Sequence, residues 1–285
     1  MSTVAAPVRA APTAVAPPPQ VRTPKRKWAP IILRSYTALG ILYLILPIGL
    51  MIMYSFNKTN AERVVLKWQG FTTEWYHPAA LFSIGDLTQA LLLSLEIAVL
   101  STILAVVLGT PIALALVRYH YRGKGTTDAI MFLNIAAPEI VMGAALLSFF
   151  VTLNVPRGFA TILISHVMFN IAFVTITVRA RLAGFDLAVE EAAQDLGATL
   201  WVTFWKVTFP TIFPGILAGA LLAFALSIDD FVITNFVAGS TQTFPLWVYG
   251  TVKVGIPPQV FVMGTLIFAV GVIIAIVNVV AQRRN

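Results

Sequence analysis

Long apolar runs separated by shorter polar stretches organise this chain. Six of these runs come close to the ~20 residues that an α-helix needs to cross the apolar core of a bilayer. We therefore predict an all-α integral membrane protein with six transmembrane helices. The expected spans are residues 36–54, 91–117, 129–153, 159–178, 212–237 and 260–280.

A charged segment, residues 183–210, separates the fourth and fifth apolar runs. Asp186 can cap the start of a short helix here, and Gly197 can end it in a left-handed turn. A second helical stretch then runs to Pro210, so the pattern predicts helix, tight turn and helix in what we call the 183–210 loop. The apolar stripe at helical spacing consists of Val189, Ala192, Ala193, Leu196 and Leu200.

The N-terminal segment, residues 1–28, is rich in Ala, Pro and Val and ends in a basic cluster. It shows no periodicity that would build a core, so we expect a disordered cytoplasmic tail. A cleaved signal peptide is not expected, because the first apolar run begins after the basic cluster and is long enough to span. Residues 29–285 are expected to form one six-helix membrane domain.

Composition supports a membrane protein. The chain is 58% hydrophobic and 11% charged, whereas a soluble domain carries about a quarter charged residues. The net charge of +7 comes from basic residues at the ends of spans, which favours contact with lipid and excludes a nucleic-acid surface. The absence of cysteine excludes a thiolate metal site and a cysteine nucleophile.

The distribution of Lys and Arg predicts the orientation. With the N-terminus inside, the inner segments hold 14 of these residues and the outer segments hold five. Positively charged loops stay in the cytoplasm, so both termini and the 183–210 loop are expected there. The loops 55–88 and 238–258 then lie outside.

The 183–210 loop resembles the signature loop of ABC-importer permeases, which reads E-A-A, three residues, Gly, nine residues and I-x-L-P. The corresponding residues are Glu191-Ala192-Ala193, Gly197 and Val207-Thr208-Phe209-Pro210, with Val in place of Ile and Phe in place of Leu. The resemblance implies a type I ABC-importer permease fold and a cytoplasmic coupling helix that docks on a separate ATPase. The expected coupling residues are Glu190, Glu191, Ala192, Ala193, Asp195, Gly197 and Pro210.

Motifs for chemistry within the chain are missing. Its only Gly-Lys pair, Gly123-Lys124, lacks the earlier glycine of a phosphate-binding loop. We therefore expect no enzyme, no metal site and no cofactor in this chain, with ATP and Mg²⁺ bound by the partner ATPase. Zinc-protease and serine-hydrolase motifs are also missing. His166, inside the fourth span, is interpreted as a packed or hydrogen-bonded helix residue.

Acidic residues inside the predicted spans point to a cargo. A charged side chain near the middle of a bilayer costs ~2.5–3.5 kcal/mol on insertion scales, so its presence suggests a use. No Lys or Arg lies in the same stretches, which favours a cationic cargo. Asp229 and Asp230 would point about 100° apart on a continuous helix, so one of them is expected to face the pathway. The candidate pathway residues are Asp229, Asp230, Glu139 and Glu96.

A second resemblance narrows the cargo. Residues 137–141, 180–198 and 224–233 look like the permeases of spermidine/putrescine ABC importers. The resemblance implies a bacterial inner-membrane subunit in a heterodimer with a second permease, two ATPase subunits and an extracytoplasmic binding protein that delivers the polyamine. An importer of another small solute, such as an opine-like compound or an aminophosphonate, stays open. So does a secondary carrier driven by ions through the membrane acids.

Overall fold

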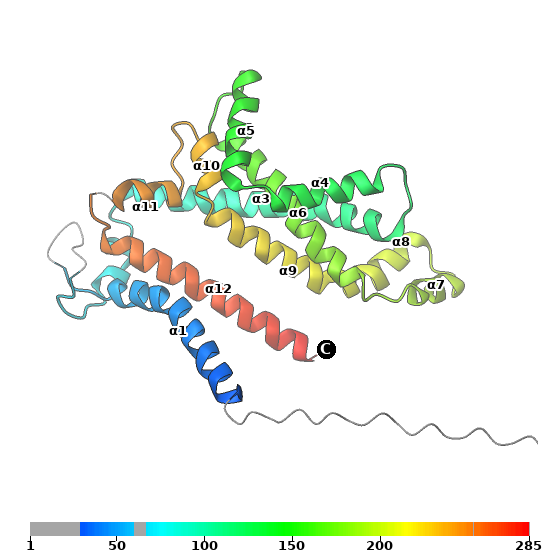
Figure 1. Ribbon diagram of the computed structural model, residues 1–285, viewed down its shortest axis with the longest axis horizontal. Helices are drawn as coiled ribbons and strands as arrows, with labels where there is room; N and C mark the ends of the chain where they lie inside the picture. The colour runs from blue at the N-terminus through cyan, green and yellow to red at the C-terminus, as the bar shows by residue number, and fades with distance from the viewer. Residues whose placement is uncertain (1–28, 60–66, 253, 285) are drawn as a thin grey trace, which may run out of the picture. The chain divides into compact units, whose positions relative to one another are not determined.

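The computed structural model describes residues 29–59, 67–252 and 254–284, and they are almost entirely helical (Figure 1). Within these residues, strand-like pairing is limited to one isolated bridge between Asn57 and Phe71. The predicted disordered tail, residues 1–28, lies outside the described residues. The α-helices are α1 (Ala29–Ser55), α2 (Pro78–Leu81), α3 (Gly85–Arg118), α4 (Lys124–Ala136), α5 (Glu139–Thr152), α6 (Phe159–Leu182), α7 (Ala188–Asp195), α8 (Leu200–Thr203), α9 (Phe209–Ile228), α10 (Val232–Val237), α11 (Phe244–Val252) and α12 (Pro258–Arg284).

The chain divides into two units, one ending at Leu50 and the other beginning at Met51. The described part of the first unit is the beginning of α1, whose large apolar side chains are exposed over most of its length. A helix with exposed apolar side chains on all its faces suits a lipid environment. The second unit contains the helical core and both candidate sites.

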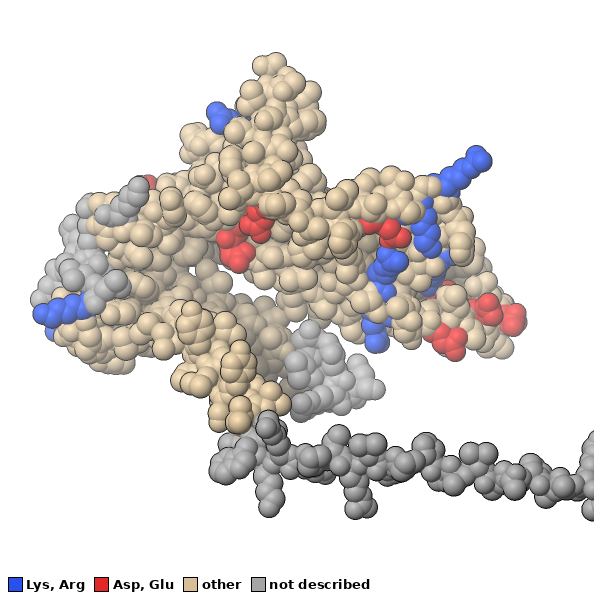
Figure 2. Space-filling model, in the orientation of Figure 1, with Lys and Arg blue, Asp and Glu red and all other residues tan. Residues whose placement is uncertain are grey.

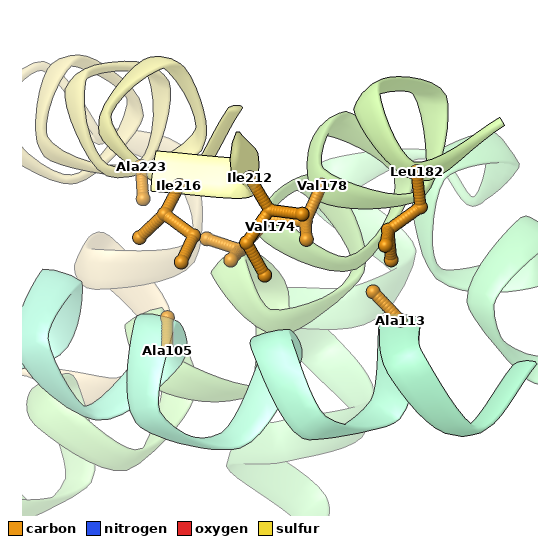
Figure 3. Packing of buried hydrophobic residues seen from close by; sticks show 8 residues of the cluster. All are labelled: Ala105, Ala113, Val174, Val178, Leu182, Ile212, Ile216 and Ala223. Atoms are coloured by element: carbon orange, nitrogen blue, oxygen red, sulfur yellow. The ribbon is translucent and has the colours of Figure 1, made fainter. Parts of the chain in front are cut away.

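The core of the second unit is formed by α3, α6 and α9, which lie side by side (Figure 1). Figure 3 shows small and branched side chains from these helices pointing toward one another. Close approach depends on glycine: a Cβ at Gly109 would lie 3.0 Å from Val174 Cγ1, and one at Gly215 would lie 2.6 Å from Arg181 Cβ. Small residues at helix contacts are typical of membrane bundles, where van der Waals packing replaces the hydrophobic driving force.

Among the residues that the structure describes, five helical segments are long and apolar enough to cross a membrane. The number becomes six when the bent pair α4 and α5 is taken as one span. The second, fourth and sixth predicted spans correspond to α3, α6 and α12, each extended by a few residues. The predicted left-handed turn after α7 is present, since Gly197 has φ +87°. At the other end the N-cap position is Leu187, and Asp186, one residue earlier, accepts from Ala188 N through Oδ1 at 3.0 Å.

The third predicted span is not a continuous helix. The chain bends by 110° between α4 and α5, where Ala137 and Pro138 are extended. Proline removes an N–H and pushes the preceding residue out of the helical region, so the helix ends before it. Glu139, expected near the middle of this span, lies at the bend, in the first turn of α5.

The fifth predicted span is wrong at both ends. Helical structure begins at Leu200 and continues through Pro210, which falls in the first turn of α9, where proline is tolerated. A π-helical segment, η2 (Phe204–Thr208), joins α8 to α9. At the other end α9 stops at Ile228 and α10 begins at Val232. Asp229 and Asp230 therefore lie in a helix break, and the expected 100° relation on one helix does not apply.

Candidate functional site

The break between α9 and α10 is held by the side chain of Asp230. Its Oδ2 accepts hydrogen bonds from Thr234 N at 2.8 Å and from Thr234 Oγ1 at 2.6 Å, and its Oδ1 accepts from Ile233 N at 3.4 Å. A carboxylate in this position satisfies backbone N–H groups that have no partner at a helix start. Asp230 therefore caps α10 from within the break.

A buried histidine extends this cap into the core. His166 Nδ1 lies 2.7 Å from Ser227 Oγ, and His166 Nε2 lies 2.8 Å from Thr234 Oγ1 and 3.2 Å from Asp230 Oδ2. Ser101 on α3 donates to Ser227 at 3.0 Å. The interpretation of His166 as a hydrogen-bonded helix residue is confirmed. Its partners lie more than 60 positions away along the chain, so no local pattern could have identified them.

Asp229 has the opposite environment. Its side chain is exposed and lines an open pocket of about 530 Å³. Aromatic rings form much of the wall, and the rings of Phe231 and Tyr249 are 4.6 Å apart at their centroids. The lining residues are Ile228, Asp229, Phe231, Phe244, Pro245, Val248, Tyr249, Val252, Gly264, Ile267 and Phe268. Asp229 is therefore the charged group of an otherwise largely apolar pocket.

Glu139 joins this region through the packing of α5 against α10. A Cβ at Gly143 would lie 2.5 Å from Phe236 Cδ2, so only glycine permits that approach. Glu139 is exposed at the start of α5, the helix that packs against α10 beyond the break. In Figure 2 acidic side chains gather below α5, apart from the basic side chains on the same face. We call Glu139, Asp229 and Asp230 the break site.

Glu96, the fourth predicted acid, is exposed on α3 and does not line the pocket beside Asp229. Its place in a pathway stays a prediction. Within the described residues, no cluster of three or more His, Asp or Glu side chains has a geometry that could hold a metal ion.

In the 183–210 loop, too, one of two adjacent acids is buried and the other is exposed. Glu190 is 9% exposed and accepts hydrogen bonds from Arg118 Nη2 and Thr208 Oγ1. Pro210 and the other predicted coupling residues are exposed, except Ala193, which is half-buried. Large apolar side chains accompany them, with Leu196 91% and Leu200 76% exposed. Glu190 was grouped with its neighbours by sequence, but it faces the protein, because adjacent helix positions point about 100° apart.

Known proteins resemble this chain along most of its length. The family model of the binding-protein-dependent transport system inner membrane component matches residues 105–284. The spermidine/putrescine transport system permease protein PotC of Escherichia coli strain K12 is 39% identical over 242 residues, covering 85% of this chain and 90% of that protein. The putrescine transport system permease protein PotI of the same strain is 37% identical over 264 residues, covering 90% of each.

Solved structures give the same fold at low sequence identity. A bacterial ABC transporter involved in import of the acidic polysaccharide alginate matches with a TM-score of 0.67 and 16% identity, over 91% of this chain and 96% of that one. The MetNI methionine ABC transporter matches with a TM-score of 0.55 and 18% identity, over 70% of this chain and 93% of that one. The predicted type I ABC-importer permease fold is confirmed. The family model matched over residues 105–284 and the apolar helices show that the chain belongs to the inner-membrane components of binding-protein-dependent transport systems, as a multi-pass permease subunit.

Proposed function

We propose that this permease subunit carries polyamines such as spermidine and putrescine into the cell by ATP-driven alternating access. The observation that carries the proposal is the break site. Asp229, in the break after α9, lines an aromatic pocket that has no Lys or Arg among its lining residues, and Glu139 begins α5, which packs against α10. The names of the two permeases from Escherichia coli support the same class of cargo.

The chemistry of the pocket suits an aliphatic amine. An ammonium group needs oxygen acceptors and is attracted to the faces of aromatic rings, while its methylene chain needs apolar walls. Asp229 supplies the acceptor, and Phe231 and Tyr249 supply adjacent rings. Asp230 is already occupied by His166 and Thr234, which leaves Asp229 and Glu139 to contact the cargo.

The same proposal includes the partners. Two ATPase subunits dock on the 183–210 loop and hold ATP and Mg²⁺, a second permease completes a heterodimer, and a binding protein delivers cargo from outside. Exposed apolar side chains on the loop, such as Leu196 and Trp201, support a protein contact there. The excess of Lys and Arg in the inner segments supports a cytoplasmic loop and cytoplasmic termini.

The test is ATP-dependent uptake of labelled spermidine and putrescine into vesicles from cells that co-express this chain and its neighbouring transporter genes. The binding protein is added on the outer side. Uptake should require ATP and fall in Asp229→Asn, with Glu96→Gln as the comparison that removes a membrane acid outside the break site. ATP-driven uptake of an opine-like compound or an aminophosphonate instead would discard the polyamine cargo. Uptake that ignores ATP and collapses with ionophores would replace the importer by a secondary carrier.

A further inference from the structure

One carboxylate connects the 183–210 loop to the helical core. Helix α7 packs chiefly against α8 and η2, the segments that follow it in the chain. Glu190 reaches beyond them, since one of its oxygens, Oε1, accepts from both Arg118 Nη2 and Thr208 Oγ1. Arg118 is the last residue of α3, and Thr208 is the last residue before α9. Three elements therefore meet at Glu190.

The surroundings hold this junction in one geometry. The side chains of Arg118 and Glu190 are 20% and 12% exposed, and Thr208 is 1% exposed. The Arg118 guanidinium carbon lies 6.0 Å from the centre of the Phe185 ring, and a basic residue at a helix C-terminus is favoured by the helix dipole. A partly buried charge that loses its partner is strongly disfavoured, so the three groups move together or separate at a cost.

The helices joined here lead to the break site. Both α3 and α9 belong to the central core, and Ser101 on α3 bonds to Ser227 in the last turn of α9, two positions before Asp229. The neighbouring ion pair between Arg179 and Asp128 joins α6 to α4 and does not involve the loop. Of these two pairs, only the one at Glu190 connects the loop to the core.

We propose that Arg118, Glu190 and Thr208 form the junction through which movement of α7 reaches α3 and α9. Arg118 and Thr208 are positioning residues for α7, while Glu191 and Asp195 remain on its exposed side for an outside partner. The transport consequence rests on the proposed ATP-driven function. The position of α7 relative to the end of α3 does not depend on that function.

The functional test uses the complete transporter in proteoliposomes and measures polyamine uptake per ATP hydrolysed. Thr208→Val and Glu190→Gln should lower this ratio about tenfold, as expected for loss of hydrogen bonding to a charged group. Thr208→Ser should retain wild-type coupling, and the exchange Arg118→Glu with Glu190→Arg should restore part of it. Thr211→Val is the matched control, because its hydroxyl donates to Val207 O in the adjoining η2 and takes no part in the junction. A ratio unchanged in Thr208→Val and Glu190→Gln would overturn the junction's role in transport.

A second measurement judges the junction even if the transporter does not carry polyamines. The chain contains no cysteine, so His120→Cys and Leu196→Cys give two exposed sites for spin labels, one beyond the end of α3 and one on the loop. Glu190→Gln and Arg118→Gln should broaden the distance distribution between the labels, and Asp128→Asn should leave it unchanged. A distribution that stays narrow in both junction variants refutes the proposal, whereas absence of polyamine uptake by wild type refutes only the proposed function.

Discussion

Two regions of this permease each contain a pair of adjacent acids, and each pair is divided in the same way. In the 183–210 loop Glu190 is buried against the protein and Glu191 is exposed. At the break site the side chain of Asp230 is 7% exposed and that of Asp229 lies open to the pocket. The buried acid of each pair bonds elements of the fold together, and its neighbour is left to contact something outside the chain.

The partners of the two buried acids differ. Glu190 is paired with Arg118, at the end of α3. Asp230 is paired with His166, Thr234 and backbone N–H groups, inside a predicted span. A permanently charged arginine is expensive within a membrane and inexpensive near its surface. Histidine, hydroxyl groups and a helix start can satisfy a carboxylate without a fixed positive charge, so depth in the membrane accounts for the choice.

The largest expected effect is that of Asp230→Ala on stability, since this change should destabilise the folded permease by several kcal/mol. The change removes the acceptor of Thr234 N and Thr234 Oγ1 and the carboxylate beside His166 Nε2, and each buried group left unsatisfied costs ~1–3 kcal/mol. Thermal unfolding in detergent should show it, with Asp229→Ala close to wild type. Equal melting of the two variants would remove the distinction between the two acids.

The next effect tests the exposed side of the loop. Gly197→Trp should abolish ATP-driven uptake while the subunit stays in the membrane, because a Cβ at Gly197 meets nothing within 4 Å and a bulky side chain would project toward a docked partner. Gly123→Trp is the matched control, since Gly123 also has a positive φ and open space around it. Both variants place a side chain at a left-handed backbone position, which costs ~1–2 kcal/mol, so full transport by Gly197→Trp would argue against docking at this turn.

A smaller effect is expected for Asp229→Asn at the break site. Spermidine uptake should fall about tenfold, because an amide cannot replace the charge of a carboxylate toward an ammonium group. Initial rates measured against spermidine concentration, at matched amounts of folded protein, check this. Glu96→Gln should have a weaker effect, since Glu96 does not line the pocket. The reverse order of the two variants would move the cargo site away from the break.

The smallest effect should come from Glu191→Gln. Its side chain is exposed, and an exposed charge contributes roughly 0–1 kcal/mol, so uptake should fall by about fivefold or less. Folding and the loop-to-α3 label distance should not change. A broadened distance in Glu191→Gln would show that the two loop glutamates are not divided as the structure indicates.

Several features of this protein follow from the sequence alone. Apolar runs of sufficient length predicted the membrane helices. In lipid no water can bond the backbone N–H and C=O groups, and a helix satisfies them all within one segment. The ends of α7 were also predictable, since Asp186 and Gly197 act on backbone within a few residues of themselves. The spacing of Glu191, Gly197 and Pro210 was enough to indicate the family.

Only the tertiary structure decided which acid of each pair is buried. The partners of Glu190 and Asp230 lie on other helices, with Arg118 separated by 72 positions from Glu190, and their proximity results from the packing of α3, α6 and α9. The helix break has the same origin, because the carboxylate of Asp230 caps α10 only when His166 and Thr234 are beside it. Hydrophobic length is a local property of the chain, whereas the pairing of buried polar groups depends on where separate helices meet.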